Sequence, residues 1–208
     1  MIHIEEWKTN KQFICSNNKK NVFLIGDSIR LQYCAMTREK LSDVAEVFYV
    51  DDNCRNTQYV ITRLNGWADM FSDPTCVDLV HFNCGHWDIA HWGGSEHSLT
   101  SEAEYARNLQ IIIDMISKLF PRAKIVFATS TTMNPNGQVG LNPRTNSEVS
   151  RYNEIAKAVA SKNNIAINDL FAVTKEWDSS CYNDHAHLTD QASIVLGQTI
   201  ATTIKSFF

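Results

Sequence analysis

The sequence lacks the features that mark several classes of protein. No apolar run approaches the length of a membrane-spanning helix, and residues 1–10 carry charged side chains where a secretory signal would be apolar. Long basic runs are missing, and a net charge of −4 provides no electrostatic footprint for nucleic acid or an anionic membrane. We therefore expect a cytoplasmic protein whose partner is a small molecule, with no nucleic-acid or membrane partner. The oligomeric state is left open.

Closely spaced cysteine pairs are also lacking. The cysteines show no CxxC spacing, and several lie in apolar segments where a reduced thiol behaves as a small hydrophobic side chain. We predict that all of them are free thiols, as is usual in a reducing compartment. A thiol nucleophile is not favoured, because no cysteine follows a strand and starts a helix beside an obvious base. The six are Cys15, Cys34, Cys54, Cys76, Cys84 and Cys181.

Short apolar runs alternate with helical patterns from residue 21 onward. Residues 22–25 form a continuous apolar run that stops at Gly26, which is typical of a strand buried on both faces of a parallel sheet. Further strands are predicted over residues 46–50, 78–83, 124–129 and 165–167.

Amphipathic helices are predicted between these strands. Apolar side chains share one helical face over residues 57–71, and Ser101 with Glu104 forms a possible capping box for a helix that stops at Pro121. Two more helices are predicted, over residues 147–162 and from Thr189 or Asp190 onward.

The alternation predicts an α/β fold with three layers: a doubly wound parallel sheet of about five strands with helices on both faces, in the flavodoxin-like order 2-1-3-4-5. We expect one domain over residues 21–208, preceded by an N-terminal extension over residues 1–20. Two connections, residues 86–100 and 132–146, are long enough to form active-site walls, although plain surface loops are an equal alternative.

Gly26-Asp27-Ser28 is placed where the first strand ends and a helix begins. Such a turn exposes a side chain at the carboxyl edge of the sheet, and the helix N-terminus offers free N–H groups to a developing oxyanion. Alone the tripeptide is weak evidence, because Ser28 could simply cap the helix.

The segment Asp184-His185-Ala186-His187 comes just before the last helix. A serine hydroxyl becomes a nucleophile when an imidazole takes its proton, and a carboxylate holds that imidazole in the required tautomer. Asp184 and His187 could fill both roles from one loop. Taken alone, solvated histidines ahead of a Thr-capped helix would be the simpler interpretation.

With both motifs in this order, the sequence resembles the SGNH, or GDSL-type, hydrolases over residues 21–204. The resemblance implies that Ser28 is the nucleophile, His187 the general base and Asp184 its orienting carboxylate. It implies a serine ester hydrolase that cleaves a small acyl ester, with O-acetyl groups on a carbohydrate as the preferred target. The Gly-x-Ser-x-Gly nucleophile elbow of other hydrolases is absent from the sequence.

Two blocks depart from the family pattern, and both concern the oxyanion hole. Family members usually show Gly-x-Asn-Asp after the third strand, whereas here Trp87 occupies the Asn position after Gly85. Either the Trp87 indole or the amide of Asn83 could donate instead, or Trp87 could merely line the pocket. The usual glycine after the second strand is missing, so a backbone N–H of Cys54 or Arg55 is expected to serve. Arg55 could alternatively pair with a nearby aspartate.

Other functions remain open. The same fold could serve a lysophospholipase or a thioesterase, or a non-catalytic binding module whose oxyanion hole has decayed. No cofactor and no metal are expected, because the histidines lack the spacing of common metal motifs. The alternative metal ligands are His86, Asp88, His91, His97, His185 and His187, and the tryptophans that could stack on a sugar are Trp87, Trp92 and Trp177.

Overall fold

A computed structural model describes residues 13–137 and 140–208. Its single sheet has five parallel strands in the order β2-β1-β3-β4-β5, which confirms the predicted topology. The strands are β1 (Lys20–Ile25), β2 (Ala45–Tyr49), β3 (Leu79–Phe82), β4 (Lys124–Ala128) and β5 (Ala166–Asn168).

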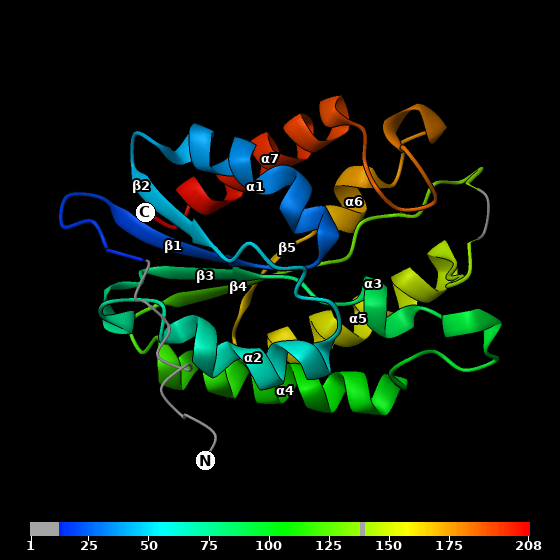
Figure 1. The fold of residues 1–208 in the computed structure, drawn as a ribbon, viewed down its shortest axis with the longest axis horizontal. Helices are drawn as coiled ribbons and strands as arrows, with labels where there is room; N and C mark the ends of the chain where they lie inside the picture. The colour runs from blue at the N-terminus through cyan, green and yellow to red at the C-terminus, as the bar shows by residue number, and fades with distance from the viewer. Residues whose placement is uncertain (1–12, 138–139) are drawn as a thin grey trace, which may run out of the picture.

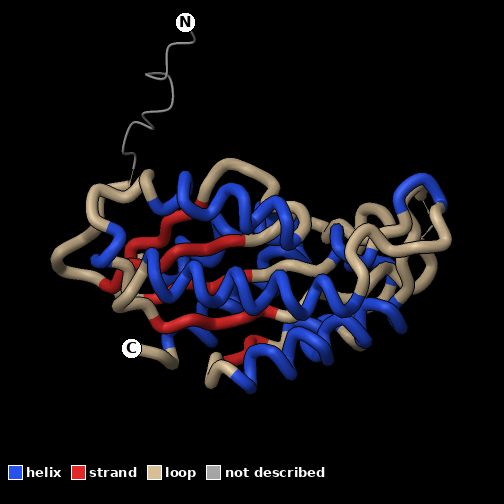
Figure 2. The backbone as a smooth tube through the Cα atoms, turned by 90° about the horizontal axis from the view of Figure 1, so that it is seen from below, coloured by secondary structure: helices blue, strands red, loops and turns tan. Residues whose placement is uncertain are grey.

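Helices cover both faces of the sheet and make three layers (Figures 1 and 2). The helices α1 and α7 pack together on one face, while α2, α4 and α5 cover the other. The long helices are α1 (Ser28–Leu41), α2 (Thr57–Ala68), α4 (Glu102–Leu119), α5 (Asn146–Lys162) and α7 (Asp190–Lys205). The shorter ones are α3 (His86–Ile89), α6 (Leu170–Thr174) and the 3₁₀ turns η2 (Pro74–Cys76), η3 (Trp92–Gly94) and η4 (Ser179–Cys181).

Strand β1 is buried on both faces, as its apolar run predicts. Val22 and Leu24 contribute to the core under α1 and α7, whereas Phe23 and Ile25 contribute to the core under α2, α4 and α5. At α4, Ser101 and Glu104 form the predicted capping box, with the Ser101 side chain and the Glu104 side chain each bonded to the other's backbone N–H. Local sequence signals and tertiary packing therefore agree.

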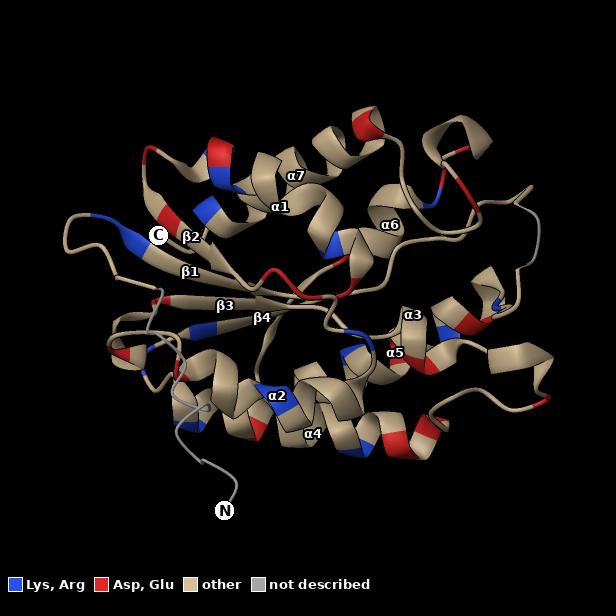
Figure 3. Cartoon of the chain, in the orientation of Figure 1, with Lys and Arg blue, Asp and Glu red and all other residues tan. Residues whose placement is uncertain are grey.

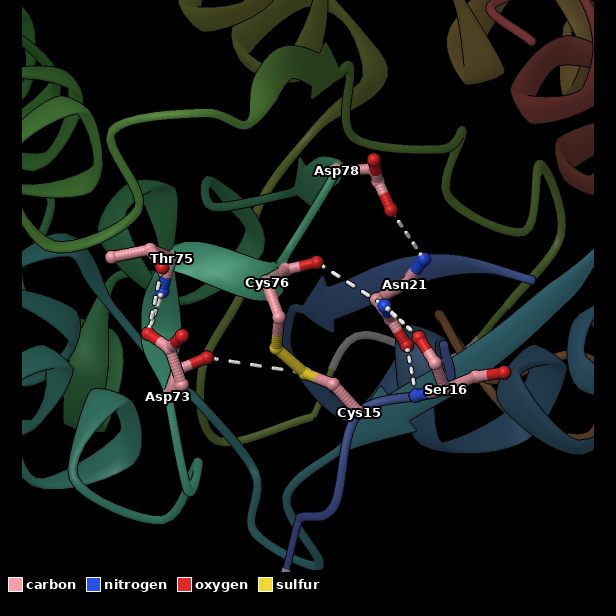
Figure 4. The surroundings of a disulfide bond; sticks show 7 residues. All are labelled: Cys15, Ser16, Asn21, Asp73, Thr75, Cys76 and Asp78. Atoms are coloured by element: carbon pink, nitrogen blue, oxygen red, sulfur yellow. Dashed lines mark hydrogen bonds between the residues drawn. A yellow bond between two sulfur atoms is a disulfide. The ribbon is translucent and has the colours of Figure 1, made fainter. Parts of the chain in front are cut away.

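The prediction that all six cysteines are free thiols is wrong. Cys15 and Cys76 form a disulfide, with Cα atoms 6.3 Å apart (Figure 4). The chain before β1 pairs with the segment after α2 through a bridge between Phe13 and Phe71, and this contact brings Cys15 beside η2. The other four cysteines are free. Because the bonded pair is 61 residues apart, local spacing could not reveal it.

The N-terminal extension predicted over residues 1–20 lies partly outside the described residues, and its boundary stays a prediction. In its described part, the Phe13 ring packs edge-on against Phe71, with centroids 5.0 Å apart. Among the described helices, none has the length and apolarity needed to cross a membrane. The cytoplasmic location also stays a prediction.

Candidate active site

Ser28 is the first residue of α1, at the carboxyl end of β1. The Asp27 side chain caps the helix by accepting the Ile29 N–H at 2.9 Å, so Asp27, not Ser28, is the N-cap. Gly26 is required by close packing, because a Cβ atom there would lie 2.6 Å from Cβ of Arg30. The turn leaves the Ser28 N–H without a hydrogen bond in the described structure, at the positive end of a 14-residue helix.

The loop before α7 lies at the same edge of the sheet (Figure 1), and His187 in this loop is hydrogen-bonded to Ser28 while Asp184 precedes it by three residues. Gln32, on the first turns of α1, holds this loop: its amide donates to the Leu188 carbonyl at 2.8 Å and accepts the Leu188 N–H at 3.0 Å. Within the loop, the Asn183 N–H donates to the His187 carbonyl at 2.8 Å. Sequence reasoning missed Gln32, because its partner is 156 residues away.

These segments bring three side chains into one hydrogen-bonded line. His187 Nε2 lies 2.8 Å from Ser28 Oγ, and His187 Nδ1 lies 2.7 Å from Asp184 Oδ2. The second oxygen, Asp184 Oδ1, accepts the backbone N–H groups of Ala186 and His187, each at 2.8 Å. The carboxylate is thereby fixed, and it fixes the imidazole in turn.

The charge of Asp184 determines the tautomer of His187. Partial burial by itself would raise the pKa of Asp184, but the N–H groups of Ala186 and His187 and the His187 ring outweigh it and lower that pKa to about 2. At neutral pH the group is a carboxylate, which only accepts hydrogen bonds. His187 Nδ1 must therefore carry hydrogen, and Nε2 is left to accept the proton of Ser28.

His185, the neighbouring histidine, takes a different position. Its Nδ1 is 3.7 Å from Asp184 Oδ1, and the residue lines a cavity together with Asn134 and Arg144. Burial, followed by the charge of Arg144, lowers the pKa of His185. The structure thus places His187, and not His185, against Ser28.

In the segment after β2, Arg55 stands where a glycine was expected, and its backbone has a conformation typical of glycine. Arg55 has φ of 47°, in the left-handed region that favours glycine. The Cys54 N–H donates to the Gly26 carbonyl at 3.1 Å, and the Arg55 N–H donates to Asn53 Oδ1 at 3.0 Å in an exposed contact. Both candidate oxyanion donors are engaged within the protein, and their role stays a prediction.

The third block, after β3, supplies two possible side-chain donors. The Asn83 amide is buried and donates one hydrogen to the Ala128 carbonyl at 2.8 Å. Gly85 lies where a Cβ atom would be 2.2 Å from Ser130 Oγ. Because β1 and β3 are neighbours, this block lies beside the Ser28 turn, as the strand order predicts.

Asp88 ties the third block to the second. It accepts the Thr57 N–H at 3.1 Å and the Thr57 hydroxyl at 2.6 Å, at the start of α2. Burial raises the pKa of Asp88 to about 6, and the bonds from Thr57 oppose that rise. Sequence reasoning treated Asp88 only as an alternative metal ligand, whereas here it positions a loop.

An aromatic groove of about 360 Å³ opens next to these blocks. The rings of Trp87 and Trp92 are 5.0 Å apart, and Trp92 is 39% exposed. The Arg55 guanidinium lies 4.8 Å from the centre of the Tyr59 ring and 5.9 Å from that of Trp87. It makes no ion pair with the described acidic residues, so the alternative pairing with a nearby aspartate is not seen. Trp177 packs against the core under α1 and α7 instead.

The alternative metal ligands do not converge. His86 is buried against Thr131, with Nε2 3.1 Å from the hydroxyl, and His91 is bound by Glu148 at 2.7 Å. In the part of the chain that the structure describes, no three His, Cys, Asp or Glu side chains gather as a metal site would require. That no metal or cofactor is used stays a prediction.

Comparison with known proteins agrees with the fold. The family model of the GDSL-like lipase/acylhydrolase family matches residues 25–193. An acetyl xylan esterase, AlAXEase, is similar in structure over 88% of this chain and 99% of its own, with 18% identity and a TM-score of 0.71. A carbohydrate acetylesterase from Sinorhizobium meliloti is similar over 91% of this chain and 100% of its own, with 15% identity and a TM-score of 0.69. A lipase/acylhydrolase from Enterococcus faecalis is similar over 90% of this chain and 96% of its own, with 18% identity and a TM-score of 0.69.

No curated protein matches the chain. The solved structures share little sequence with it and show the fold alone. The family match carries more weight, because it spans most of the chain and includes both Ser28 and Asp184-His187. The chain therefore belongs to the GDSL-like lipase/acylhydrolase family, a family of carboxylic ester hydrolases.

Proposed function

We propose that the protein is a serine esterase that removes a small acyl group, acetyl first of all, from a carbohydrate. The observation that carries the proposal is the continuous line from Asp184 through His187 to Ser28, with contacts of 2.7 and 2.8 Å. Three groups acting as nucleophile, base and orienter within hydrogen-bond reach are the requirement for this chemistry.

In the proposed reaction, Ser28 Oγ attacks the ester carbonyl carbon while His187 Nε2 takes the hydroxyl proton. The carbon–oxygen bond to the alcohol then breaks, and His187 returns the proton to the leaving oxygen. Water attacks the acyl-enzyme with His187 as base, which releases the acid and restores Ser28. Asp184 stabilises the imidazolium in both halves.

The oxyanion is assigned to the N-terminal end of α1. The Ser28 N–H makes no hydrogen bond with the described residues, so it is available to donate to the negative charge that develops on the ester oxygen. We assign the second donor to the Arg55 N–H, which must leave Asn53, and a further donor to Asn83 or Trp87. The Cys54 N–H is the weaker candidate, since its bond to Gly26 holds the turn together.

The carbohydrate part of the proposal rests on the aromatic groove. Exposed indole and phenol faces are suited to stacking on a sugar ring, and Tyr59, Trp87 and Trp92 line the groove with Arg55. Two structures of similar fold are named as acetyl xylan and carbohydrate acetylesterases, which makes acetylated sugars the first substrates to test. Figure 3 shows both signs of charge interspersed over the helices, which suits a small-molecule partner.

A panel of 4-nitrophenyl esters of increasing acyl length tests the proposal. We expect the acetyl ester to be hydrolysed fastest, and Ser28→Ala to reduce the rate by several orders of magnitude. A preference for long chains would indicate a lysophospholipase or thioesterase. Equal rates for wild type and Ser28→Ala would identify a non-catalytic binding module instead.

A further inference from the structure

A second cavity, of about 230 Å³, lies beside the loop that carries His187. Its walls come from the connection between β4 and α5 and from His185. Asn134 joins the two walls: its N–H donates to the His185 carbonyl at 3.0 Å, and its amide donates to the Asp184 carbonyl at 2.9 Å. The cavity is therefore built onto the backbone of the candidate catalytic loop.

Arg144 is the charged side chain in this cavity. It precedes Thr145, the N-cap of α5, and its guanidinium makes no hydrogen bond or ion pair with residues 13–137 or 140–208. The Nε atom is buried without a partner. Arg144 is partly exposed, and a buried guanidinium nitrogen such as its Nε is normally hydrogen-bonded, because removing a donor from water is costly.

The other polar groups of the cavity are already engaged. Asn146 accepts the Met133 N–H at 2.6 Å and donates to the Met133 carbonyl at 3.1 Å. The nearest carboxylates make no ion pair with Arg144: Asp27 caps α1 through Oδ1 while its buried Oδ2 has no hydrogen-bond partner, and both oxygens of Asp184 are bonded within its own loop. Burial lowers the pKa of Arg144, while the charges of Asp27 and Asp184 oppose that change from a distance. The N–H groups of the Arg144 guanidinium therefore have no partner among the described residues and are available to a ligand.

The position of the cavity indicates which part of an ester would reach it. His187 must return a proton to the leaving alcohol, so the oxygen of that alcohol lies beside His187 Nε2. The cavity is lined by His185, two residues before His187 in the same loop, and by Asn134, which donates to the Asp184 carbonyl. The alcohol, rather than the acyl group, is the part placed to contact Arg144.

We infer that Arg144 binds a carboxylate on the alcohol portion of the substrate, so that the preferred substrate is an acylated acidic sugar such as an O-acetylated uronic acid. The inference rests on the proposed esterase function. A planar guanidinium matches the two oxygens of a carboxylate through paired N–H bonds, and this geometry is specific to arginine. The imidazole of His185 offers a further N–H on the same wall.

The test compares two substrates that differ only in the charged group: a mono-O-acetylated methyl glucuronoside and the same acetylated methyl glucoside. The measured quantity is the ratio of kcat/KM for the acidic over the neutral sugar. We expect wild type to prefer the acid at least tenfold, and Arg144→Gln to lower the ratio by roughly 10- to 100-fold, the effect of losing a hydrogen bond to a charged group. Arg144→Lys should give an intermediate ratio, because it keeps the charge without the fork.

Arg107→Gln is the matched control, since Arg107 is exposed on α4 and should leave the ratio unchanged. A wild-type ratio near one that Arg144→Gln does not move would overturn the inference while hydrolysis of the neutral sugar upholds the esterase function. Failure of wild type on both sugars and on 4-nitrophenyl acetate would reject the proposed function itself.

Binding without turnover provides a second measurement if Arg144→Gln fails to fold. Titration calorimetry on the Ser28→Ala protein should show glucuronate binding at least tenfold more tightly than glucose. Arg144→Lys in the same background should reduce that difference. Equal affinities for the two sugars in Ser28→Ala would overturn the assignment of Arg144.

Discussion

Replacing Asp184 by asparagine isolates the orienting role of the carboxylate with almost no change of shape. The amide oxygen can still accept the N–H groups of Ala186 and His187 that Oδ1 accepts at 2.8 Å. The amide nitrogen, however, replaces Oδ2, which lies 2.7 Å from His187 Nδ1. Two hydrogen donors cannot face each other, so Nδ1 must lose its hydrogen and Nε2 must gain one.

That tautomer cannot accept the proton of Ser28, whose Oγ is 2.8 Å from His187 Nε2. In serine hydrolases with the same arrangement, this substitution lowers kcat by about 10⁴. We expect a loss of that order here, equivalent to roughly 5 kcal/mol of transition-state stabilisation at 1.36 kcal/mol per tenfold change. The loss should appear in kcat and not in KM, because the carboxylate does not contact the substrate.

The assay is hydrolysis of 4-nitrophenyl acetate between pH 7 and 9, with the rate of Ser28→Ala subtracted. Asp178→Asn is the matched control: Asp178 caps η4 in the segment before α7 and accepts the Ser180 N–H at 2.8 Å. Its activity should stay within threefold of wild type. If Asp184→Asn retains more than a tenth of the wild-type rate, Asp184 does not orient His187 and the argument from the tautomer is wrong.

The same variant has a stability signature in acid. The pKa of Asp184 is lowered from 3.8 to about 2 in the folded protein, so its ionised form stabilises the fold above pH 3.8. This contribution is lost as the pH falls from 3.8 to about 2. Urea unfolding over that range should show a pH-dependent component in wild type that is missing from Asp184→Asn.

Three further outcomes are expected. His185→Ala should keep most of the activity towards 4-nitrophenyl acetate, and an inactive variant would mean that His185 is the base. Either Asn83→Ala or Trp87→Phe, but not both, should lower kcat by about 100- to 1000-fold, while losses below threefold in each would leave an oxyanion hole of backbone N–H groups alone. Cys15→Ser should destabilise the fold by roughly 4 kcal/mol, the chain-entropy effect of opening a loop with a separation of 61 residues, and an unchanged melting temperature would contradict it.

Much of the fold could be predicted because the strands are local signals. A strand buried on both faces must be apolar throughout, and the run at residues 22–25 lies inside the observed β1 (Lys20–Ile25). Helix starts were accurate where a capping box specifies them, as at Ser101 before α4. The short α3 and α6 were not predicted, because four or five residues are too few to show a helical period.

The candidate site was predictable only where it is written in short motifs. Ser28, Asp184 and His187 occur in two local blocks, and the strand order brings these blocks together. Gln32 and Arg144 carry no comparable signal. Their roles depend on residues that are distant in the sequence. Gln32 bonds to a loop 156 residues away, and Arg144 lines a cavity together with His185.

The two residues that depart from the family pattern, Arg55 and Trp87, lie next to each other. Their common position helps to distinguish a protein that has lost its activity from an enzyme with a changed specificity. Arg55 keeps the glycine-like φ of 47°, so the loop retains its course although the side chain is new. The new side chain lies over Tyr59, with Trp87 beside it, and the three line one groove. If the protein had lost its activity, substitutions would be expected throughout the active site, including at the residues that hold Ser28, His187 and Asp184 in contact. Here Ser28 and His187 remain 2.8 Å apart while the replaced residues build a common surface, which favours an enzyme whose substrate contacts have changed.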